Sequence, residues 1–516
     1  MGAQVNRPRP SDKALRAKGE AAQPFPHWHR LSAMTIFAGK QRQVNGLVIS
    51  TLADTLVRGV EEAGDRISGA FFEPVIRLGV TGLARSGKTV FITSLVANML
   101  DRGRMNGLVA AQEGRIAAAF LQPQPDDTIP RFDYEAHLSD LSGPTPHWPD
   151  STRAISELRL SLRVKPAGLL AGLQGTRTVH LDIVDYPGEW LLDLALLDKT
   201  FTQWSDEVLA RIKPRPEAAG FLGQLDAADL HARHDEVAAK PLASGFTAYL
   251  QAARDAGFYD CTPGRFLLPG DLAGSPAISF APLPGPRAGR GTLWREFERR
   301  YEAYKSQVVK PFFRDHFARI DRQIVLVDAL GAIHKGPAAV EDMRHAMADI
   351  LGAFRPGKNA FLSQILLGKR VEKILFAATK ADHIHHTQHA RLTAIIEALT
   401  REARDRAGFA GADTQALAIA ALRATTEETR DHQGQSLDMV RGTLLETGKQ
   451  AALYPGALPE DPNALLHPAR NGAESWLEGD FEAMRFAPAA MSLKPGFGPP
   501  HIRLDRAVQF LIGDRL

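Results

Sequence analysis

The sequence predicts an α/β fold, in which a mostly parallel sheet is flanked by helices and interrupted by a large helical insertion. Three observations support this prediction. An apolar run at residues 75–80 leads into a glycine-rich loop and a helix-like stretch, a second apolar run ends in D-x-x-G, and a third ends in T-K-A-D. Strands that alternate with helical patterns in this way are typical of parallel sheets.

The composition indicates a globular protein with a sizeable core. The chain has 516 residues, of which 44% are hydrophobic and 23% charged, and a formal net charge of +3. This mild charge without a basic stripe predicts no nucleic-acid partner. The single cysteine, Cys261, excludes an internal disulfide and fits a reducing compartment. No stretch approaches the ~18 apolar residues of a transmembrane segment, and no signal peptide is evident, so we expect a cytoplasmic protein.

The loop at residues 82–89 reads GLARSGKT and matches the phosphate-binding pattern G-x-x-x-x-G-K-[ST]. Glycines let backbone N–H groups turn inward around a phosphate chain, and the following helix adds the positive end of its dipole. Lys88 would supply charge to the β- and γ-phosphates, and Thr89 a hydroxyl to Mg²⁺. An ordinary glycine turn before a helix is the alternative, but the flanking strand and helix favour a P-loop NTPase. The binding candidates are Gly82, Ala84, Arg85, Ser86, Gly87, Lys88, Thr89 and Val90.

Residues 102–150 lack sustained periodicity, which predicts a long connection. In nucleotide switches, the segment between the phosphate-loop helix and the next strand closes over the γ-phosphate. Here it ends in Ser151, Thr152 and Arg153, before a predicted strand at 155–164. We favour Thr152 over Ser151 as the hydroxyl of a magnesium shell. Arg153 and Arg85 are each candidates for an internal arginine finger, although either could instead bind ground-state phosphate or solvent.

The second apolar run, residues 179–184, ends in Asp185-Tyr186-Pro187-Gly188. Asp185 at the strand tip could hold Mg²⁺ through water, and the Gly188 N–H could meet the γ-phosphate, whereas a plain Pro-Gly turn is the alternative. Glu189 stands where many nucleotide switches carry a glutamine that orients the attacking water. Its carboxylate could order water, but its charge opposes an approaching phosphate, so we expect slow hydrolysis. The catalytic candidates are Lys88, Thr152, Gly188, Glu189, Arg85 and Arg153; the metal candidates are Thr89, Thr152 and Asp185.

The third apolar run, residues 373–378, ends in Thr379-Lys380-Ala381-Asp382. Asp382 could accept two hydrogen bonds from the adjacent N–H donors of guanine, while the Lys380 stem lies against the base. Thr379 replaces the commoner Asn, and a surface K-x-D after a strand is the alternative. A further strand at 416–422 leads into a loop where a backbone contact to the base carbonyl is expected, with Ala421, Leu422 and Arg423 as candidates.

Four histidines crowd the start of the next predicted helix, at positions 383, 385, 386 and 389. His385 and His389 have the four-residue spacing that could share a metal. No carboxylate or cysteine pattern in the neighbouring sequence completes such a site, which favours solvated or capping roles.

The patterns divide the chain into five parts. Residues 1–45 form a flexible basic arm, and 46–198 the first half of the nucleotide-binding core, which opens with an amphipathic helix at 47–67. Residues 199–318 form a mainly helical insertion, in which a separate subdomain is plausible and a helix at 293–320 breaks near Pro311. Residues 319–425 form the second half of the core, and 426–516 a turn-rich C-terminal extension that closes on the core with a helix at 502–512.

The ordered motifs GLARSGKT, WPDST, DYPG and TKAD, with the phrases VVKPFFRDHFARIDRQIVLVDAL, LLPGDLAGSP and PHIRLDRAVQFLIGDRL, resemble the YcjX family of bacterial P-loop proteins. The resemblance spans residue 46 to the C-terminus. It implies a GTPase-like α/β core with large insertions, a stress-linked role, and an inner-membrane protein as partner, which would place the chain in the cytoplasm or at the periphery of the inner membrane.

The motifs and the resemblance together predict a GTP-binding switch that slowly hydrolyses GTP to GDP with Mg²⁺. Two alternatives stay open at this point. One is an ATPase of the same P-loop class, because ATPase is a common description in the family. The other is a scaffold that nucleotide stabilises without functional turnover.

Overall fold

The computed structural model describes residues 73–83, 85–150, 154–167, 175–352, 371–409, 411–432, 434–476, 481–491 and 493–516. These residues belong to one compact unit that begins at Glu73. The predicted basic arm and the predicted helix at 47–67 lie outside the described residues.

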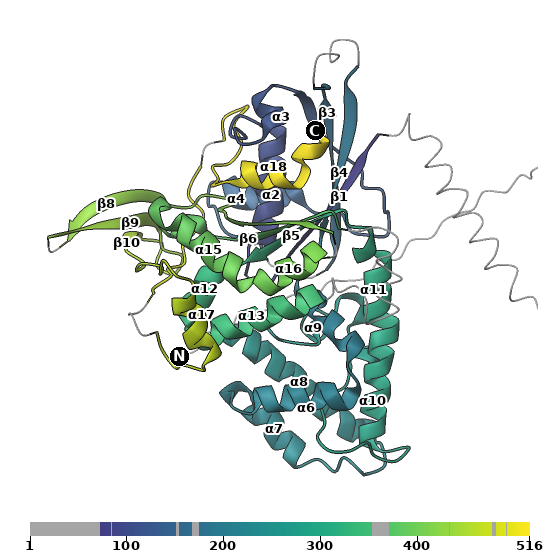
Figure 1. The fold of residues 1–516 in the computed structure, drawn as a ribbon. Helices are drawn as coiled ribbons and strands as arrows, with labels where there is room; N and C mark the ends of the chain where they lie inside the picture. Colours follow the sequence, from purple (N-terminus) through teal and green to yellow (C-terminus); the bar gives the residue numbers. More distant parts are fainter. Residues whose placement is uncertain are drawn as a thin grey trace, which may run out of the picture. The chain divides into compact units, whose positions relative to one another are not determined.

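A seven-stranded sheet organises the fold, with the strand order β2-β3-β4-β1-β5-β6-β7 (Figure 1). Strands β4, β1, β5, β6 and β7 are parallel, whereas β3 pairs antiparallel with both β4 and β2. The predicted α/β class with a mostly parallel sheet is confirmed. The strands are β1 Val75–Gly82, β2 Ile116–Gln122, β3 Ser156–Val164, β4 Arg177–Asp185, β5 Arg322–Val327, β6 Lys373–Ala378 and β7 Asp413–Ala418.

Helices cover both faces of this sheet, because the central strands are apolar on both sides. On β5, Ile324 and Leu326 join the core beneath α2 and α18, whereas Val325 and Val327 join the core shared with α12, α13 and α15. The core helices are α2 Lys88–Leu100, α12 Ala329–Lys335, α13 Pro337–Gly352, α15 His389–Leu399, α16 Arg401–Phe409, α17 Asn463–Arg470 and α18 Leu504–Ile512.

The insertion packs on the sheet face opposite α2 and α18 (Figure 1). Its buried aromatic side chains, among them Trp204, Trp294 and Tyr301, belong to the same continuous core as Val325 and Val327 of β5, so this part of the chain does not have a core of its own. The insertion helices are α6 Phe201–Ile212, α7 Ala219–Asp226, α8 Glu236–Ala256, α9 Gly264–Leu267, α10 Leu293–Tyr304 and α11 Lys310–Asp315.

The expected break near Pro311 is not a break. A π-helical turn, Lys305–Val309, joins α10 directly to α11. Pro311 follows this turn, in which the Lys310 N–H donates to the Lys305 carbonyl. The π-helical turn changes the hydrogen-bonding pattern directly before Pro311, where the helix must accommodate a residue without an N–H.

Residues 102–150 are not the plain connection that the sequence predicts. They contain α3 Val109–Gln112, the edge strand β2 and α4 Tyr134–Ser142. Strand β2 reads IAAAFLQ, and only Ile116 in it is buried. An edge strand of this kind lacks the alternation of apolar and polar residues by which strands are recognised.

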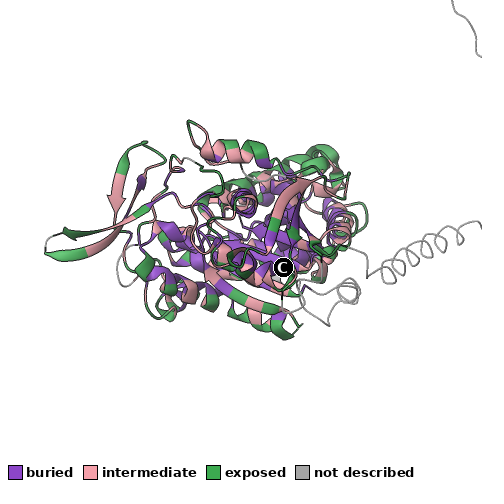
Figure 2. Cartoon of the chain, turned by 90° about the horizontal axis from the view of Figure 1, so that it is seen from above, coloured by how far each residue is buried: buried purple, intermediate pink, exposed green. Residues whose placement is uncertain are grey.

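The C-terminal extension contains a second sheet that the sequence analysis also misses. Strands β8 Thr426–His432, β9 Gln435–Thr443 and β10 Gln450–Leu453 form an antiparallel sheet in the order β10-β9-β8. Strand β8 reads TEETRDH and is exposed or half-buried throughout. Strands β8 and β9 form the hairpin that projects from the molecule in Figure 2, where most of it is pink or green. Within the described ranges, no helix combines the length and apolar character needed to cross a membrane.

Candidate functional site

A cavity of about 930 Å³ lies at the carboxyl ends of β1, β6 and β7. One part of its wall is the phosphate loop, from Arg85 to Phe91, and another is formed by Thr379, Lys380 and Asp382 after β6. Loops that follow neighbouring parallel strands meet at the same sheet edge, which is where α/β folds bind ligands. The loops that the sequence assigns to phosphate and to base therefore line one cavity.

The phosphate loop has the backbone form that a cradle for anions requires. Gly87 has φ 82°, and Arg85 also lies in the left-handed region with φ 64°. The Lys88 ammonium folds over the loop and donates a hydrogen bond to the Gly82 carbonyl at 2.9 Å. Ser86, Thr89 and Val90 line the cavity as well, whereas Ala84 lies outside the described residues.

The D-x-x-G segment is in direct contact with the start of this loop. A Cβ atom added at Gly188 would lie 2.2 Å from the Gly82 oxygen and 2.6 Å from its carbonyl carbon. The two backbones can therefore approach this closely only because residue 188 is glycine.

The two proposed oxygen donors for a divalent cation come from the phosphate loop and from β4. Thr89 lines the cavity. Asp185, which is 1% exposed, ends β4 in register with Val80 of the neighbouring β1 and is not among the residues that line the cavity. A hydroxyl and a carboxylate are ligands that Mg²⁺ prefers, so these residues fit that ion. Ser151, Thr152 and Arg153 lie outside the described residues, but Trp148, Pro149, Asp150 and Ala154 on either side of them line the cavity.

Glu189 begins the short helix α5 (Glu189–Leu192) and lines the same cavity. It is 6% exposed, and its Oε2 has no hydrogen-bond partner among the described residues. A buried carboxylate oxygen without a protein donor is an acceptor for water. The water-ordering role of Glu189 stays a prediction.

The insertion is also in close contact with α5. A Cβ atom added at Gly264 would lie 2.1 Å from the Glu189 carbonyl oxygen. The Trp190 indole donates to the Leu268 carbonyl at 3.2 Å, and the Arg265 guanidinium lies 3.2 Å from the centre of the Trp190 ring. Helix α5 is thus held by contacts with both the phosphate loop and the insertion.

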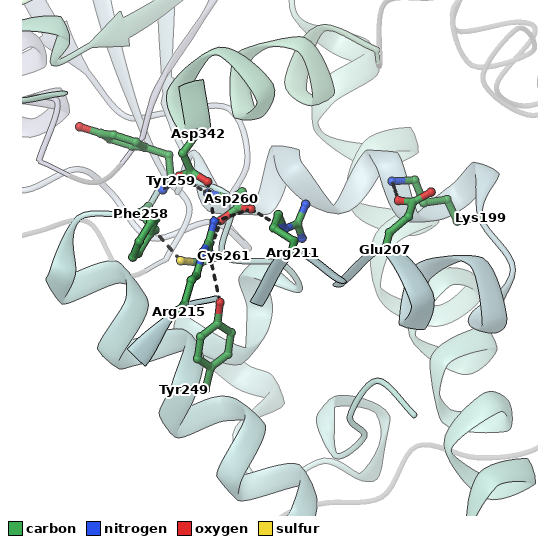
Figure 3. A network of polar contacts seen from close by, with 10 residues as sticks. All are labelled: Lys199, Glu207, Arg211, Arg215, Tyr249, Phe258, Tyr259, Asp260, Cys261 and Asp342. Carbon is green, nitrogen blue, oxygen red and sulfur yellow. Dashed lines mark hydrogen bonds and ion pairs between the residues drawn. The ribbon is translucent and has the colours of Figure 1, made fainter. Parts of the chain in front are cut away.

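A buried polar network fixes this part of the insertion to α13 (Figure 3). The Arg215 guanidinium donates to Asp260 at 2.9 Å and to Asp342 of α13 at 2.9 Å. Asp342 in turn accepts the Tyr259 and Asp260 backbone N–H groups. Burial, together with the neighbouring Asp260 charge, raises the pKa of Asp342 to about 7. The segment that leads into Gly264 is therefore anchored to the core.

At the other end of the cavity, the loop after β7 holds Asp382. The Ala424 N–H donates to Asp382 Oδ2 at 2.8 Å, and the Thr425 hydroxyl donates to the Asp382 carbonyl. Ala421 and Leu422 line the cavity. The Arg423 side chain is not among the lining residues and instead donates to the Thr425 carbonyl at 3.0 Å.

Lys380 has φ 60° and pairs with Asp328, which directly follows β5. Burial by itself raises the pKa of Asp328, but the Lys380 charge, its hydrogen bond and the Gly331 N–H together outweigh burial, so the pKa is lowered. The sequence analysis did not single out Asp328, although its place directly after an apolar strand is a signal that could have identified it.

The sequence model of the YcjX-like family matches residues 76–516. The chain belongs to the YcjX-like family. Two curated relatives are both described as "Ras-like GTPase YcjX". The Escherichia coli (strain K12) protein is 38% identical over 456 residues, which cover 86% of this chain and 96% of the relative. The Shewanella oneidensis (strain MR-1) protein is 37% identical over 468 residues, covering 86% and 94%. The resemblance that the motifs indicate is confirmed.

In this YcjX-like chain, several cavity residues come from parts of the sequence that carry no nucleotide motif. Arg254 and Asp255 lie at the end of α8, Leu267 ends α9, and residues 268–270 follow α9. Phe486 lies on the other side, where its carbonyl accepts the Trp148 indole N–H at 2.7 Å. Among these motif-free parts of the sequence, only residues 267–271, LLPGD, belong to a phrase that carried the family resemblance.

Proposed function

We propose that the chain is a GTP-binding switch that hydrolyses GTP slowly with Mg²⁺. The observation that carries the proposal is the shared cavity, with Lys88 of the phosphate loop on one part of its wall and Asp382 on another. Its volume of about 930 Å³ is within the usual range of small-molecule sites, about 300–1,000 Å³. Both curated relatives carry the description "Ras-like GTPase", which supports guanine over adenine.

The proposed chemistry is positioning and charge neutralisation. Lys88 and the backbone N–H groups of the loop bind phosphate oxygens, and Glu189 orders the attacking water. When bound, Mg²⁺ would be held by Thr89 and Asp185 and would offset phosphate charge. Phosphoryl transfer needs little covalent work from the protein, so these interactions can carry most of the catalysis. The stress-linked role and the inner-membrane partner stay predictions from the family resemblance.

The preference for guanine is tested by replacing Asp382 with alanine. We expect the affinity for GDP to fall about 10- to 100-fold, because a hydrogen bond to a charged group contributes about 1.5–3 kcal/mol. The affinity for ADP should change little, since adenine does not present the two adjacent N–H donors that Asp382 would bind. Isothermal titration calorimetry with GDP and ADP measures both.

Asp413→Ala is the matched control, because Asp413 is exposed at the start of β7, at the end of that strand opposite the cavity. It should leave both affinities unchanged. Equal affinities of the unmodified chain for GDP and ADP would contradict the guanine assignment and favour the ATPase alternative.

The role of Glu189 is tested by two substitutions with opposite expected effects. Glu189→Gln keeps an oxygen that can accept a hydrogen bond from water. It removes the negative charge of a carboxylate whose Oε2 has no hydrogen-bond partner among the described residues. It should raise the single-turnover rate of GTP hydrolysis about tenfold by relieving repulsion of the γ-phosphate. Glu189→Ala removes the acceptor and should lower the rate about 10- to 100-fold. GTP affinity should stay within about twofold in both.

A Glu189→Gln rate as low as that of Glu189→Ala would show instead that the carboxylate acts as a base. Loss of GTP affinity in parallel with the rate would refute a specific role in hydrolysis. No detectable turnover in the unmodified chain would favour the scaffold alternative.

A further inference from the structure

Two neighbouring histidines and a glutamate lie together beside the base-reading loop. One ligand atom from each of His385, His386 and Glu427 lies within 4.8 Å of the other two. His386 Nδ1 is 2.7 Å from Glu427 Oε2, and His385 Nε2 is 3.7 Å from the same oxygen. The sequence suggests no such site, because its carboxylate comes from β8, about forty residues further along the chain.

The spacing of these atoms suits a small tetrahedral cation. With metal–ligand bonds of about 2.0–2.1 Å, neighbouring ligand atoms in a tetrahedral zinc site lie about 3.3 Å apart. The two separations to Glu427 Oε2 bracket that value. His385 is buried, whereas the His386 side chain is 64% exposed and can rotate to adjust its distance.

The surroundings of His385 have the second layer that histidine ligands in metal sites generally show. Its other ring nitrogen, Nδ1, lies 3.0 Å from the Thr387 hydroxyl oxygen and 3.3 Å from Asp438 Oδ2. The Thr387 hydroxyl donates to the same Asp438 oxygen at 3.2 Å, so its own oxygen is oriented to accept the Nδ1 proton. Acceptance of the Nδ1 proton by this pair leaves Nε2 as the ligand atom and makes it more basic.

A guanidinium also lies beside Glu427. Arg423 Nη2 is 3.6 Å from Glu427 Oε1, whereas both histidine contacts are to Oε2. Oε2 is therefore the oxygen that can act as the ligand atom.

We infer that His385, His386 and Glu427 form a binding site for a divalent transition metal of the Zn²⁺ class, with Asp438 orienting His385. Two imidazoles and one carboxylate make a donor set typical of zinc and unlike the all-oxygen sets of Mg²⁺ and Ca²⁺. Water would complete a fourth position.

Such a metal would link the two loops that hold Asp382. His385 follows Asp382 in the same loop, and Glu427 follows Thr425, whose hydroxyl donates to the Asp382 carbonyl. A metal ion that binds both segments favours the conformation in which they lie together, and this conformation includes the contacts that hold Asp382. Metal at this site should therefore order the base end of the cavity.

The test is a titration of the full chain with Zn²⁺ after treatment with a chelator, without nucleotide and against a competing chromophoric chelator. The unmodified chain should bind one tight equivalent that His385→Ala and Glu427→Gln each lose. Asp438→Asn should keep that equivalent but weaken it roughly 10- to 100-fold. His345→Ala is the matched control, because His345 also pairs with a glutamate, Glu341, but belongs to no metal-ligand cluster among the described residues.

Two results would overturn the inference. One is a tight equivalent that persists in His385→Ala, which would place the metal elsewhere. The other is the absence of tight binding to the unmodified chain, which would leave the cluster as histidine–carboxylate ion pairs that take up protons only. Circular dichroism of each variant shows whether a loss of binding comes from a loss of folding.

A second readout is the affinity for GDP with and without one equivalent of Zn²⁺. It should rise about tenfold with metal in the unmodified chain and not in His385→Ala. This readout rests on the proposed function, whereas the metal titration does not. The zinc site can therefore be refuted without refuting the GTP-binding function, and the reverse. A site that binds Zn²⁺ without changing GDP affinity would retain the metal and remove its link to Asp382.

Discussion

Replacing Lys88 with alanine should lower the kcat/KM of GTP hydrolysis about 100- to 1,000-fold, the usual cost of losing one preorganised group that stabilises transition-state charge. The Lys88 ammonium already lies over the phosphate loop, bound to the Gly82 carbonyl. The Lys88 side chain therefore needs no large rearrangement to bind phosphate oxygens. Single-turnover hydrolysis and titration with a fluorescent GTP analogue would separate its contribution to catalysis from its contribution to binding.

Lys213→Ala is the control for the loss of one lysine charge, since Lys213 is exposed just after α6 and away from the cavity. It should hydrolyse GTP at the unmodified rate. Should Lys88→Ala keep both rate and affinity, the assignment of the 82–89 loop to phosphate would be wrong.

The parts of the fold that the sequence predicts are those with a local signal. The run before Thr379 is apolar on both faces, which is what a strand in the middle of a parallel sheet requires. The run before Gly82 buries Ile76, Leu78 and Val80 on one face and is recognised by the glycine-rich motif that follows it. The motif after each strand then places its residues at one sheet edge. For this reason, the convergence of Lys88 and Asp382 on one cavity could be predicted without coordinates.

What the sequence does not predict depends on contacts between distant segments. Nothing local marks Arg254 as a cavity residue, because its position follows from the packing of the whole insertion on α13 through Arg215 and Asp342. Glu427 likewise lies on a polar strand without alternation and meets His386 only through tertiary structure. A sequence pattern shows which residues can act, and the fold decides which of them meet.

Gly188 is a position where this tertiary information makes a strong prediction. Gly188→Ala should lower single-turnover hydrolysis about 100-fold, the cost of displacing reacting groups by about 1 Å. The added Cβ would lie 2.2 Å from the Gly82 oxygen, so one of the two backbones must move. Movement of helix α5 would disturb a second close contact, because Gly264 of the insertion lies against the Glu189 carbonyl. Overpacking of this kind also destabilises a fold by about 1–3 kcal/mol, which a thermal melt would detect.

Gly220→Ala separates this steric effect from the general effect of replacing a glycine. Gly220 lies in α7, and a Cβ added there would meet no atom within 4 Å. Alanine at a helical position of this kind should stabilise the chain by up to about 1 kcal/mol and leave hydrolysis unchanged. If Gly188→Ala behaved in the same way, the phosphate loop and the D-x-x-G segment could not be in the contact described.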